Sequence, residues 1–191
     1  MYLIIDCETT GLPKNWKAPI SDIENWPRVI QIAWALYDRE GRHLESATHL
    51  ILPEGFEIPY EAQRVHGIST ARAIAEGIKI STVLGEFDRA VDASTVVVAH
   101  NLRFDESVIS AEYLRLNSEP PFPSKKRVCT MLSSTDFCRI QGPYGYKWPT
   151  LSQLHRELFK KDYEEAHDAG ADVAACAKCF LELKRLRVLS V

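Results

Sequence analysis

The chain has 191 residues, and its 23 lysines and arginines against 26 aspartates and glutamates give a net charge of −3. Apolar residues make up 46% of the chain and charged residues 26%, which is typical of one globular domain and excludes a disordered protein. The negative charge argues against a protein that coats nucleic acid nonspecifically. It does not exclude an enzyme that holds one strand end through metal ions and a few local cations.

The start of the chain and its cysteines bear on where the protein works. The apolar run Leu3–Ile5 is too short for a signal peptide and has no basic flank. No segment approaches the roughly 20 apolar residues of a membrane span. The five cysteines are scattered and odd in number, which predicts reduced thiols rather than a disulfide framework. We therefore expect a cytoplasmic protein.

The first part of the chain predicts three strands. Residues 2–7 form an apolar run typical of a buried strand, and 28–38 and 42–52 predict an antiparallel hairpin around a turn signal at 38–41. The intervening segment 11–27 contains a glycine and three prolines and predicts a long loop.

Helical and apolar patterns alternate in the rest of the chain. Residues 53–80 predict loops and short helical turns, and 81–92 predict a helix with Ser81 as its N-cap. The remaining predicted elements are, in order, a buried strand at 95–99, a helix at 104–116, a short strand at 128–130, and helices at 150–159 and 168–187.

This order of elements predicts an α/β fold. An antiparallel meander followed by strand–helix units indicates one mixed sheet flanked by helices, in a single domain over residues 1–191. Functional groups in open sheets gather beyond the C-terminal ends of strands. Asp6 and Glu8 lie at one such end, and His100 and Asn101 at another.

The first polar segment is 6–11, Asp-Cys-Glu-Thr-Thr-Gly. Residues two apart in a strand point to the same face, so Asp6 and Glu8 aim two carboxylates at one point. Gly11 lets the backbone turn away tightly. Two like charges side by side are costly unless a cation lies between them. By itself, however, an Asp-x-Glu pair is more often a solvated strand edge.

The second segment, 100–105, directly follows the buried strand at 95–99. Asp105 falls in the first turn of the next predicted helix. A favourable interaction with the helix dipole is an adequate explanation for this residue taken alone.

The third segment, 167–172, opens the last predicted helix. We interpret Asp168 as the N-cap of that helix. Asp172 lies one turn further on, in a stretch of alanine and glycine that allows the helix to approach the sheet closely. An acid there is partly buried and needs a partner. His167 lies just outside the helix, where a histidine is usually an ordinary loop residue.

Together and in this order, the three segments resemble the exonuclease motifs of the DEDDh family, in the RNase H-like superfamily. That family includes the proofreading epsilon subunit of bacterial DNA polymerase III, RNase T and oligoribonuclease. The histidine five residues before the last aspartate marks the DEDDh branch. The resemblance covers residues 2–183 and implies a mixed five-stranded sheet with helices on both faces. The matching residues are Asp6, Glu8, Thr9, Thr10 and Gly11; His100, Asn101, Phe104 and Asp105; and His167, Asp168, Ala169 and Asp172.

The resemblance implies a reaction with two divalent cations. Four carboxylates without a cluster of cysteine or histidine ligands favour Mg²⁺ or Mn²⁺. By the family's pattern, Asp6 bridges both ions. Glu8 and Asp172 complete the site of the ion that carries the attacking water, and Asp105 holds the second ion. His167 deprotonates the water.

The resemblance also indicates substrate-binding residues. The backbone of Thr9 is expected to bind the terminal 3′-hydroxyl. His66, in the segment 65–69, resembles a residue of the proofreading subunit near the terminal base. The full expected set is Thr9, Thr10, His66, Asn101 and Phe104.

We therefore predict a metal-dependent 3′→5′ exonuclease that releases nucleoside 5′-monophosphates from single-stranded DNA, in proofreading or repair. A DNA polymerase is a candidate partner, and no membrane association is expected. The same residues suit a 3′→5′ exoribonuclease that trims RNA ends, because selection against the 2′-hydroxyl depends on pocket shape. A catalytically silent interaction module is a third interpretation, and the intact acids and histidine argue against it.

The long loop contains two tryptophans, and the last predicted helix contains two cysteines. Trp16 and Trp26 in the loop suit either base stacking or anchoring of the loop to the core. Cys176 and Cys179 lie on the last predicted helix without a second pair of metal ligands, which predicts buried small side chains.

Overall fold

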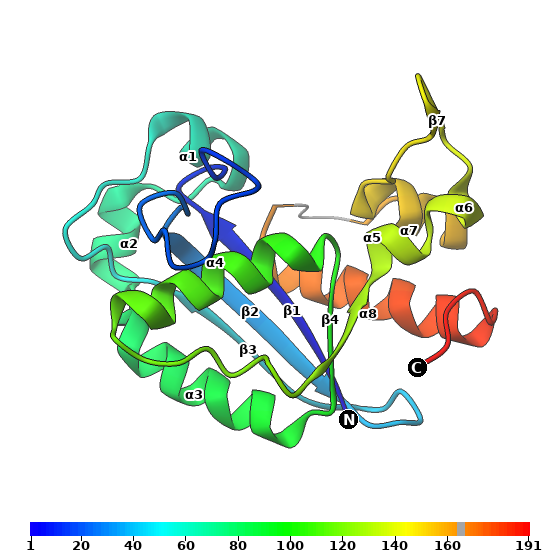
Figure 1. Cartoon of the computed structure of the whole chain (residues 1–191), viewed down its shortest axis with the longest axis horizontal. Helices are drawn as coiled ribbons and strands as arrows, with labels where there is room; N and C mark the ends of the chain where they lie inside the picture. The colour runs from blue at the N-terminus through cyan, green and yellow to red at the C-terminus, as the bar shows by residue number, and fades with distance from the viewer. Residues whose placement is uncertain (164–166) are drawn as a thin grey trace.

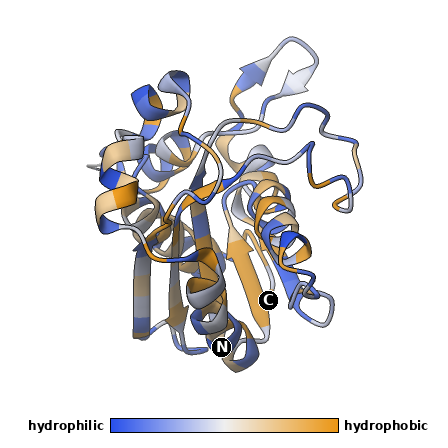
Figure 2. Cartoon of the chain, turned by 90° about the vertical axis from the view of Figure 1, so that its left-hand side faces the viewer, coloured by the Kyte–Doolittle hydropathy of each residue, from blue (hydrophilic) through white to orange (hydrophobic). Residues whose placement is uncertain are grey.

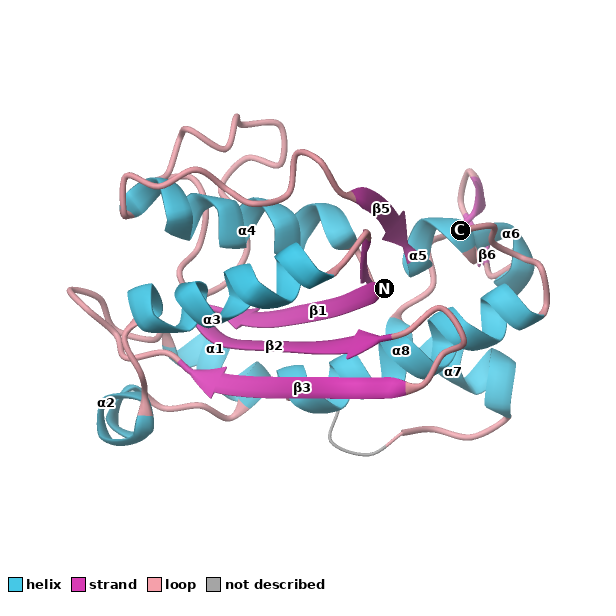
Figure 3. Ribbon diagram, turned by 90° about the horizontal axis from the view of Figure 1, so that it is seen from below, coloured by secondary structure: helices cyan, strands magenta, loops and turns pink. Residues whose placement is uncertain are grey.

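A single five-stranded sheet forms the centre of the computed structural model, which describes residues 1–163 and 167–191. The strands lie in the order β3-β2-β1-β4-β5 (Figure 3). Strand β2 pairs antiparallel with both β1 and β3, whereas β4 and β5 run parallel to β1. Their bounds are β1 Tyr2–Thr9, β2 Val29–Tyr37, β3 His43–Leu50, β4 Val96–Ala99 and β5 Lys126–Cys129.

Strand β1 is apolar on both faces because helices cover both sides of the sheet. Leu3 and Ile5 point into one core cluster, and Ile4 points into the other. Helices α3 (Ile80–Ala93) and α4 (Leu102–Arg115) supply the first cluster, whereas α7 (Leu151–Phe159) and α8 (Ala169–Arg185) supply the second (Figure 1). The predicted mixed sheet with helices on both faces is confirmed.

Short elements lie around the end of the sheet at which β1 finishes (Figure 1). Helices α1 (Tyr60–His66) and α2 (Thr70–Glu76) pack on a small cluster that includes Ile30 of β2. On the other side lie α5 (Thr130–Ser133) and α6 (Thr135–Cys138). A hairpin of β6 (Gln141–Gly142) and β7 (Gly145–Tyr146) follows them and projects from the body of the molecule (Figure 2).

The loop 11–27 is anchored to α4 by a buried ionic network. Arg115 donates hydrogen bonds to the carbonyls of Ile23 and Trp26, at 2.6 and 2.7 Å. Glu112, whose side chain is 2% exposed, accepts from the guanidinium groups of Arg28 and Arg115, both at 2.9 Å. Trp26 is buried, so it anchors the loop to the core.

Most predicted elements are present, with specific corrections. Ser81 is not an N-cap, because α3 already begins at Ile80 after Lys79, and no side chain caps it. The short strand predicted at 128–130 starts earlier, at Lys126, because parallel pairing with β4 extends it. The cysteine pair of α8 is buried as predicted, and all five cysteines are free. The sequence patterns did not predict α5, α6 or the β6–β7 hairpin. No helix among the described residues is long and apolar enough to cross a membrane.

Candidate active site

Asp6 and Glu8 project from the last part of β1. They occupy alternate positions of the strand, so they share a face, and both remain partly exposed while Cys7 between them is buried. Burial raises the pKa of Asp6 well above its usual range, and the charges of Asp105 and Asp172 raise it further. Burial also raises the pKa of Glu8, to about 8.

Asp105 reaches the same strand from the first turn of α4. It is buried, and its Oδ1 accepts hydrogen bonds from the backbone N–H of Cys7 at 3.1 Å and from the Cys7 thiol at 3.2 Å. Burial raises the pKa of Asp105 to about 7, and the two donors from Cys7 partly oppose this rise. A helix-dipole interaction alone therefore does not explain Asp105, because its carboxylate also accepts hydrogen bonds from Cys7 of β1.

The start of α8 is held tightly against the sheet. Asp168 caps the helix as predicted, accepting from the N–H of Ala171 at 3.1 Å, and its second oxygen accepts from the side chain of Gln31 on β2 at 3.0 Å. A Cβ at Gly170 would lie 2.8 Å from Oγ1 of Thr48. The small residues predicted to allow a close approach of this helix to the sheet do so here.

Asp172 receives hydrogen bonds at both carboxylate oxygens. The hydroxyl of Tyr163 donates to Oδ1, and the backbone N–H of His167 donates to Oδ2 at 3.2 Å. Burial raises the pKa of Asp172, although these donors partly oppose the effect. The ring of Tyr163 also packs against that of His155 on α7, with 5.3 Å between the ring centroids, so packing fixes its position. The pattern of acids gave no signal for Tyr163.

His167 lies beside the carboxylates although it precedes α8. Its backbone adopts a φ of 71°, in the left-handed region, and its side chain is exposed. A ligand atom of His167 lies within 4.8 Å of ligand atoms of both Glu8 and Asp172. The structure thus brings together the four acids and the histidine of the three motifs, namely Asp6, Glu8, Asp105, His167 and Asp172.

These residues suit a hard divalent cation better than a soft one. Their ligand oxygens belong to carboxylates that repel one another, so the neighbouring acids raise the pKa of Asp6. A bound cation would therefore stabilise the ionised cluster. Cys7 is not a competing thiolate ligand, because burial raises its pKa well above the usual range and its thiol donates to Asp105.

The expected substrate-binding residues make different contacts. The hydroxyl of Thr9 donates to the carbonyl of Gly11 at 2.7 Å, and that of Thr10 accepts from the N–H of Arg28 at 2.9 Å. Both side chains therefore shape the turn. The backbone N–H of Thr10 also holds the turn, because it donates to the carbonyl of Arg28 at 2.9 Å.

The other three expected residues differ in their exposure and contacts. Burial lowers the pKa of His66, and the nearby charge of His167 lowers it further. Asn101 has a left-handed backbone, with φ at 74°, at the start of α4. The ring of Phe104 lies 5.8 Å from that of Trp16 in the long loop, so this tryptophan is positioned over the start of α4.

His100 has a structural role that its motif did not predict. Its two ring nitrogens lie 3.0 Å from the hydroxyl of Thr130 and 2.9 Å from the carbonyl of Pro149. Burial lowers the pKa of His100 to about 4, so the ring is neutral at ordinary pH. It connects the end of β4 to the first residue of α5 and to the segment before α7.

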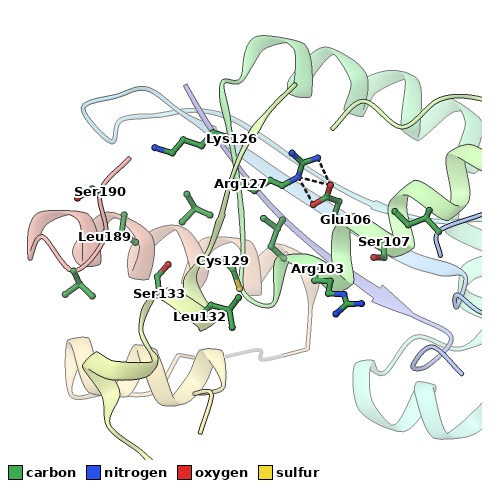
Figure 4. A pocket seen from close by; sticks show the side chains of 14 residues that line it. Arg103, Glu106, Ser107, Lys126, Arg127, Cys129, Leu132, Ser133, Leu189 and Ser190 are labelled. Carbon is green, nitrogen blue, oxygen red and sulfur yellow. Dashed lines mark hydrogen bonds and ion pairs between the residues drawn. The ribbon is translucent and has the colours of Figure 1, made fainter. Parts of the chain in front are cut away.

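A cavity of about 750 Å³ lies elsewhere, between α4, β5 and the last residues of the chain (Figure 4). Arg127 of β5 crosses it to pair with Glu106 of α4 at 2.8 Å. None of the clustered acids lines this cavity, so it is separate from the candidate site.

A family model and a curated relative both match most of the chain. The RNase_T family model, described as an exonuclease, matches residues 3–180. The chain is 27% identical over 179 residues to DNA polymerase III subunit epsilon of Treponema pallidum (strain Nichols), covering 94% of this chain and 74% of that protein.

Solved structures of E. coli Exonuclease I share the fold. The complex with a dA16 oligonucleotide has a TM-score of 0.78 at 19% identity, over 98% of this chain and 42% of that one. The zinc-bound form of its complex with single-stranded DNA has a TM-score of 0.74 at 22% identity, over 97% and 40% of the two chains. The chain therefore spans about two fifths of the length of these Exonuclease I chains.

Proposed function

The chain belongs to the RNase_T family of exonucleases, and from this premise we propose that it is a metal-dependent 3′→5′ exonuclease that acts on single-stranded DNA. The observation that carries the proposal is the convergence of Glu8, His167 and Asp172, from two distant parts of the chain, within 4.8 Å of one another. Asp6 and Asp105 join them at the same strand end. This combination suits hydrolysis of a phosphodiester bond.

Asp6, Glu8, Asp105 and Asp172 are the proposed ligands of two divalent cations, Mg²⁺ or Mn²⁺, with Asp6 shared between them. When bound, such a pair stabilises the charge on the attacking and leaving oxygens of an in-line displacement. The zinc ion of the Exonuclease I complex with single-stranded DNA is a different ion in a related fold, so the identity of the metal here is part of the proposal.

His167 is the proposed general base. Its imidazole takes a proton from the attacking water, whose oxygen forms a bond to the phosphorus of the last phosphodiester. The bond from phosphorus to the 3′-oxygen of the preceding nucleotide breaks, and that oxygen takes up a proton. The products are a nucleoside 5′-monophosphate and a strand shortened by one nucleotide with a free 3′-hydroxyl.

The terminal nucleotide is proposed to bind between the turn after β1 and the start of α4. The backbone of Thr9 would contact the 3′-hydroxyl, Thr10 would shape the turn beside it, and His66 would contact the terminal base. His66 is suited to stacking because its ring offers an aromatic face to a base. Asn101 and Phe104 would complete the pocket from α4.

Single-stranded DNA is the proposed substrate because Exonuclease I, which shares this fold, was solved with a dA16 oligonucleotide. The likeness to an epsilon subunit supports a DNA polymerase as a proposed partner and proofreading or repair as the proposed role. The single domain over 1–191 is likewise proposed as the catalytic unit.

The test is digestion of matched DNA and RNA oligonucleotides labelled at the 5′ end, with Mg²⁺, Mn²⁺ or chelator. We expect a ladder of DNA products that shortens from the 3′ end and requires metal. Preferential digestion of RNA would replace the DNA proposal with an exoribonuclease. Full turnover in excess EDTA would remove the two-metal mechanism, and no digestion under any condition would leave an interaction module.

A further inference from the structure

Three aromatic side chains gather on the hairpin formed by β6 and β7, which we call the aromatic hairpin (residues 141–148). Tyr144, at the turn, is 102% exposed, Trp148 is 63% exposed and Tyr146 is 43% exposed. Tyr144 lies in the turn, Tyr146 lies on β7, and Trp148 lies two residues beyond Tyr146, so the three rings belong to one short segment. Exposing three large rings on one projecting hairpin is costly in water, and such patches usually mark a binding site.

The backbone of the hairpin is well defined. Gln141 pairs with Tyr146 and Gly142 with Gly145, and the N–H of Lys147 donates to the carbonyl of Ile140 at 2.9 Å. Gly145 has a φ of 116°, which allows the tight turn directly after Tyr144. The rings are therefore displayed on a paired hairpin rather than on an irregular loop.

The charge around the aromatic hairpin suits a polyanion. The whole segment 137–156 contains no aspartate or glutamate, although the chain carries a net charge of −3. It holds the cations Arg139, Lys147 and Arg156. Arg156 is paired with Asp162, whereas Arg139 and Lys147 are in no ion pair with any of the described residues.

The aromatic hairpin is connected to the carboxylate cluster through the core. The carbonyl of Pro149, which follows Trp148 directly, lies 2.9 Å from a ring nitrogen of His100, and His100 lies at the strand–helix junction that precedes Asp105. In Figure 1 the hairpin rises with α5, α6 and α7 on one side of the sheet end, and α1 with the loop 11–27 rises on the other.

We propose that the aromatic hairpin is a stacking platform for single-stranded nucleic acid, which holds bases upstream of the 3′ end that reacts. Tyr144, Tyr146 and Trp148 stack on successive bases, and Arg139 and Lys147 contact phosphates. Stacking on rings tolerates any base, as an enzyme that shortens a strand stepwise requires. The position of the reacting end rests on the proposed function; the binding of a strand by the hairpin does not.

The test compares two substrates in the same variants. The p-nitrophenyl ester of thymidine 5′-monophosphate has no upstream base, whereas a long oligothymidylate reaches the platform. For Tyr144→Ala and Trp148→Ala we expect the KM for the oligothymidylate to rise at least about fivefold, with hydrolysis of the ester unchanged. Tyr144→Phe should keep the wild-type KM. Leu44→Ala, an exposed apolar residue at the opposite end of the sheet, is the matched control.

A binding measurement separates the platform from the reaction. Fluorescence anisotropy with a labelled oligothymidylate in EDTA should show weaker binding by Tyr144→Ala and Trp148→Ala than by the wild type. The affinity of Lys147→Ala should depend less steeply on salt concentration than the affinity of Lys178→Ala, the control variant at an exposed lysine on α8. Unchanged affinity and unchanged KM in both aromatic variants would overturn the proposal. Equal losses on the ester and on the strand would overturn it too, because the hairpin would then only support the active site. If the wild type binds the strand through the hairpin but hydrolyses neither substrate, the platform stands and the proposed function falls.

Discussion

The hydroxyl of Tyr163 donates a hydrogen bond to Oδ1 of Asp172, 2.5 Å away. The other oxygen of that carboxylate accepts from the backbone N–H of His167. Two donors from outside α8 therefore fix the plane of a carboxylate that projects from its first turn. Donors of this kind orient metal ligands in many proteins, and their loss weakens metal binding.

We expect Tyr163→Phe to weaken divalent metal binding by about 10-fold or more, because second donors to a ligand typically contribute this much. Turnover at saturating metal should stay near that of the wild type. The measurement is nuclease rate against metal concentration. Tyr113→Phe is the matched control, because Tyr113 donates to Asp88 in a similar pair away from the cluster. An unchanged metal dependence would show that Tyr163 only packs against α7.

The metal-free protein should lose stability as the pH rises. Burial raises the pKa of Asp105 to about 7 and of Glu8 to about 8, whereas the unfolded values lie near 4. At pH values between the unfolded and the folded pKa, the folded state binds more protons than the unfolded state. The free energy of unfolding therefore falls as the pH rises. Thermal melts in EDTA from about pH 5 to about pH 8 should therefore show a falling Tm.

Divalent metal should reverse this trend, because it binds the ionised cluster only in the folded protein. Metal at about 100 times its Kd would add roughly 2.7 kcal/mol to the free energy of unfolding. A Tm in EDTA that rises or stays level over the same pH range would contradict the raised pKa values.

Asp6→Ala should abolish turnover, because Asp6 is the proposed ligand shared by both ions. The fold should survive, since removing one acid relieves repulsion from Asp105 and Asp172. We expect the variant in EDTA to melt no lower than the wild type and to lose its response to added metal. Asp92→Ala, an exposed acid on α3, is the control and should change neither rate nor melting. Cleavage by Asp6→Ala near the wild-type rate would remove the proposed metal bridge.

His167→Ala should slow the reaction by roughly 10²–10⁴-fold, the usual range for a general base. Metal affinity should change little, because His167 is not proposed as a ligand. Single-turnover rates measured against metal concentration give both quantities. A variant that keeps the wild-type rate at saturating metal would exclude His167 as the base, and His43→Ala is the control for an exposed histidine.

The buried network around Glu112 should dominate the stability of the long loop. Glu112→Ala leaves Arg28 and Arg115 without their shared acceptor, and such losses cost about 3–5 kcal/mol. Glu106→Ala breaks a more exposed pair with Arg127 and should cost about 1 kcal/mol or less. Urea unfolding of both variants gives the comparison. Similar small losses in the two would show that the loop is not anchored by this network.

The local patterns of the sequence were enough to predict the strands and the main helices, and the resemblance to the DEDDh family singled out the acids of the candidate site. Alternation placed Asp6 and Glu8 on one face of β1, and the predicted starts of two helices placed Asp105 and Asp172 in their first turns. These properties depend on residues a few positions apart, whose geometry the backbone dictates. Gln31 is a buried polar residue in an otherwise apolar strand, and its side chain donates to the capping residue Asp168. The periodicity of the strand does not reveal this contact.

Other features were decided only by the tertiary structure, because they join groups that no local period relates. The hydrogen bond from Cys7 to Asp105 joins residues that are 98 positions apart in the chain. The approach of His167 to Glu8 requires α8 to pack on the sheet. The orienting role of Tyr163 and the exposure of Tyr144 and Trp148 beside two-residue strands also depend on where the surrounding elements pack. A strand of two residues is too short to show an alternation of polar and apolar residues. The contacts that stabilise it form only when long-range packing has brought distant segments of the chain together.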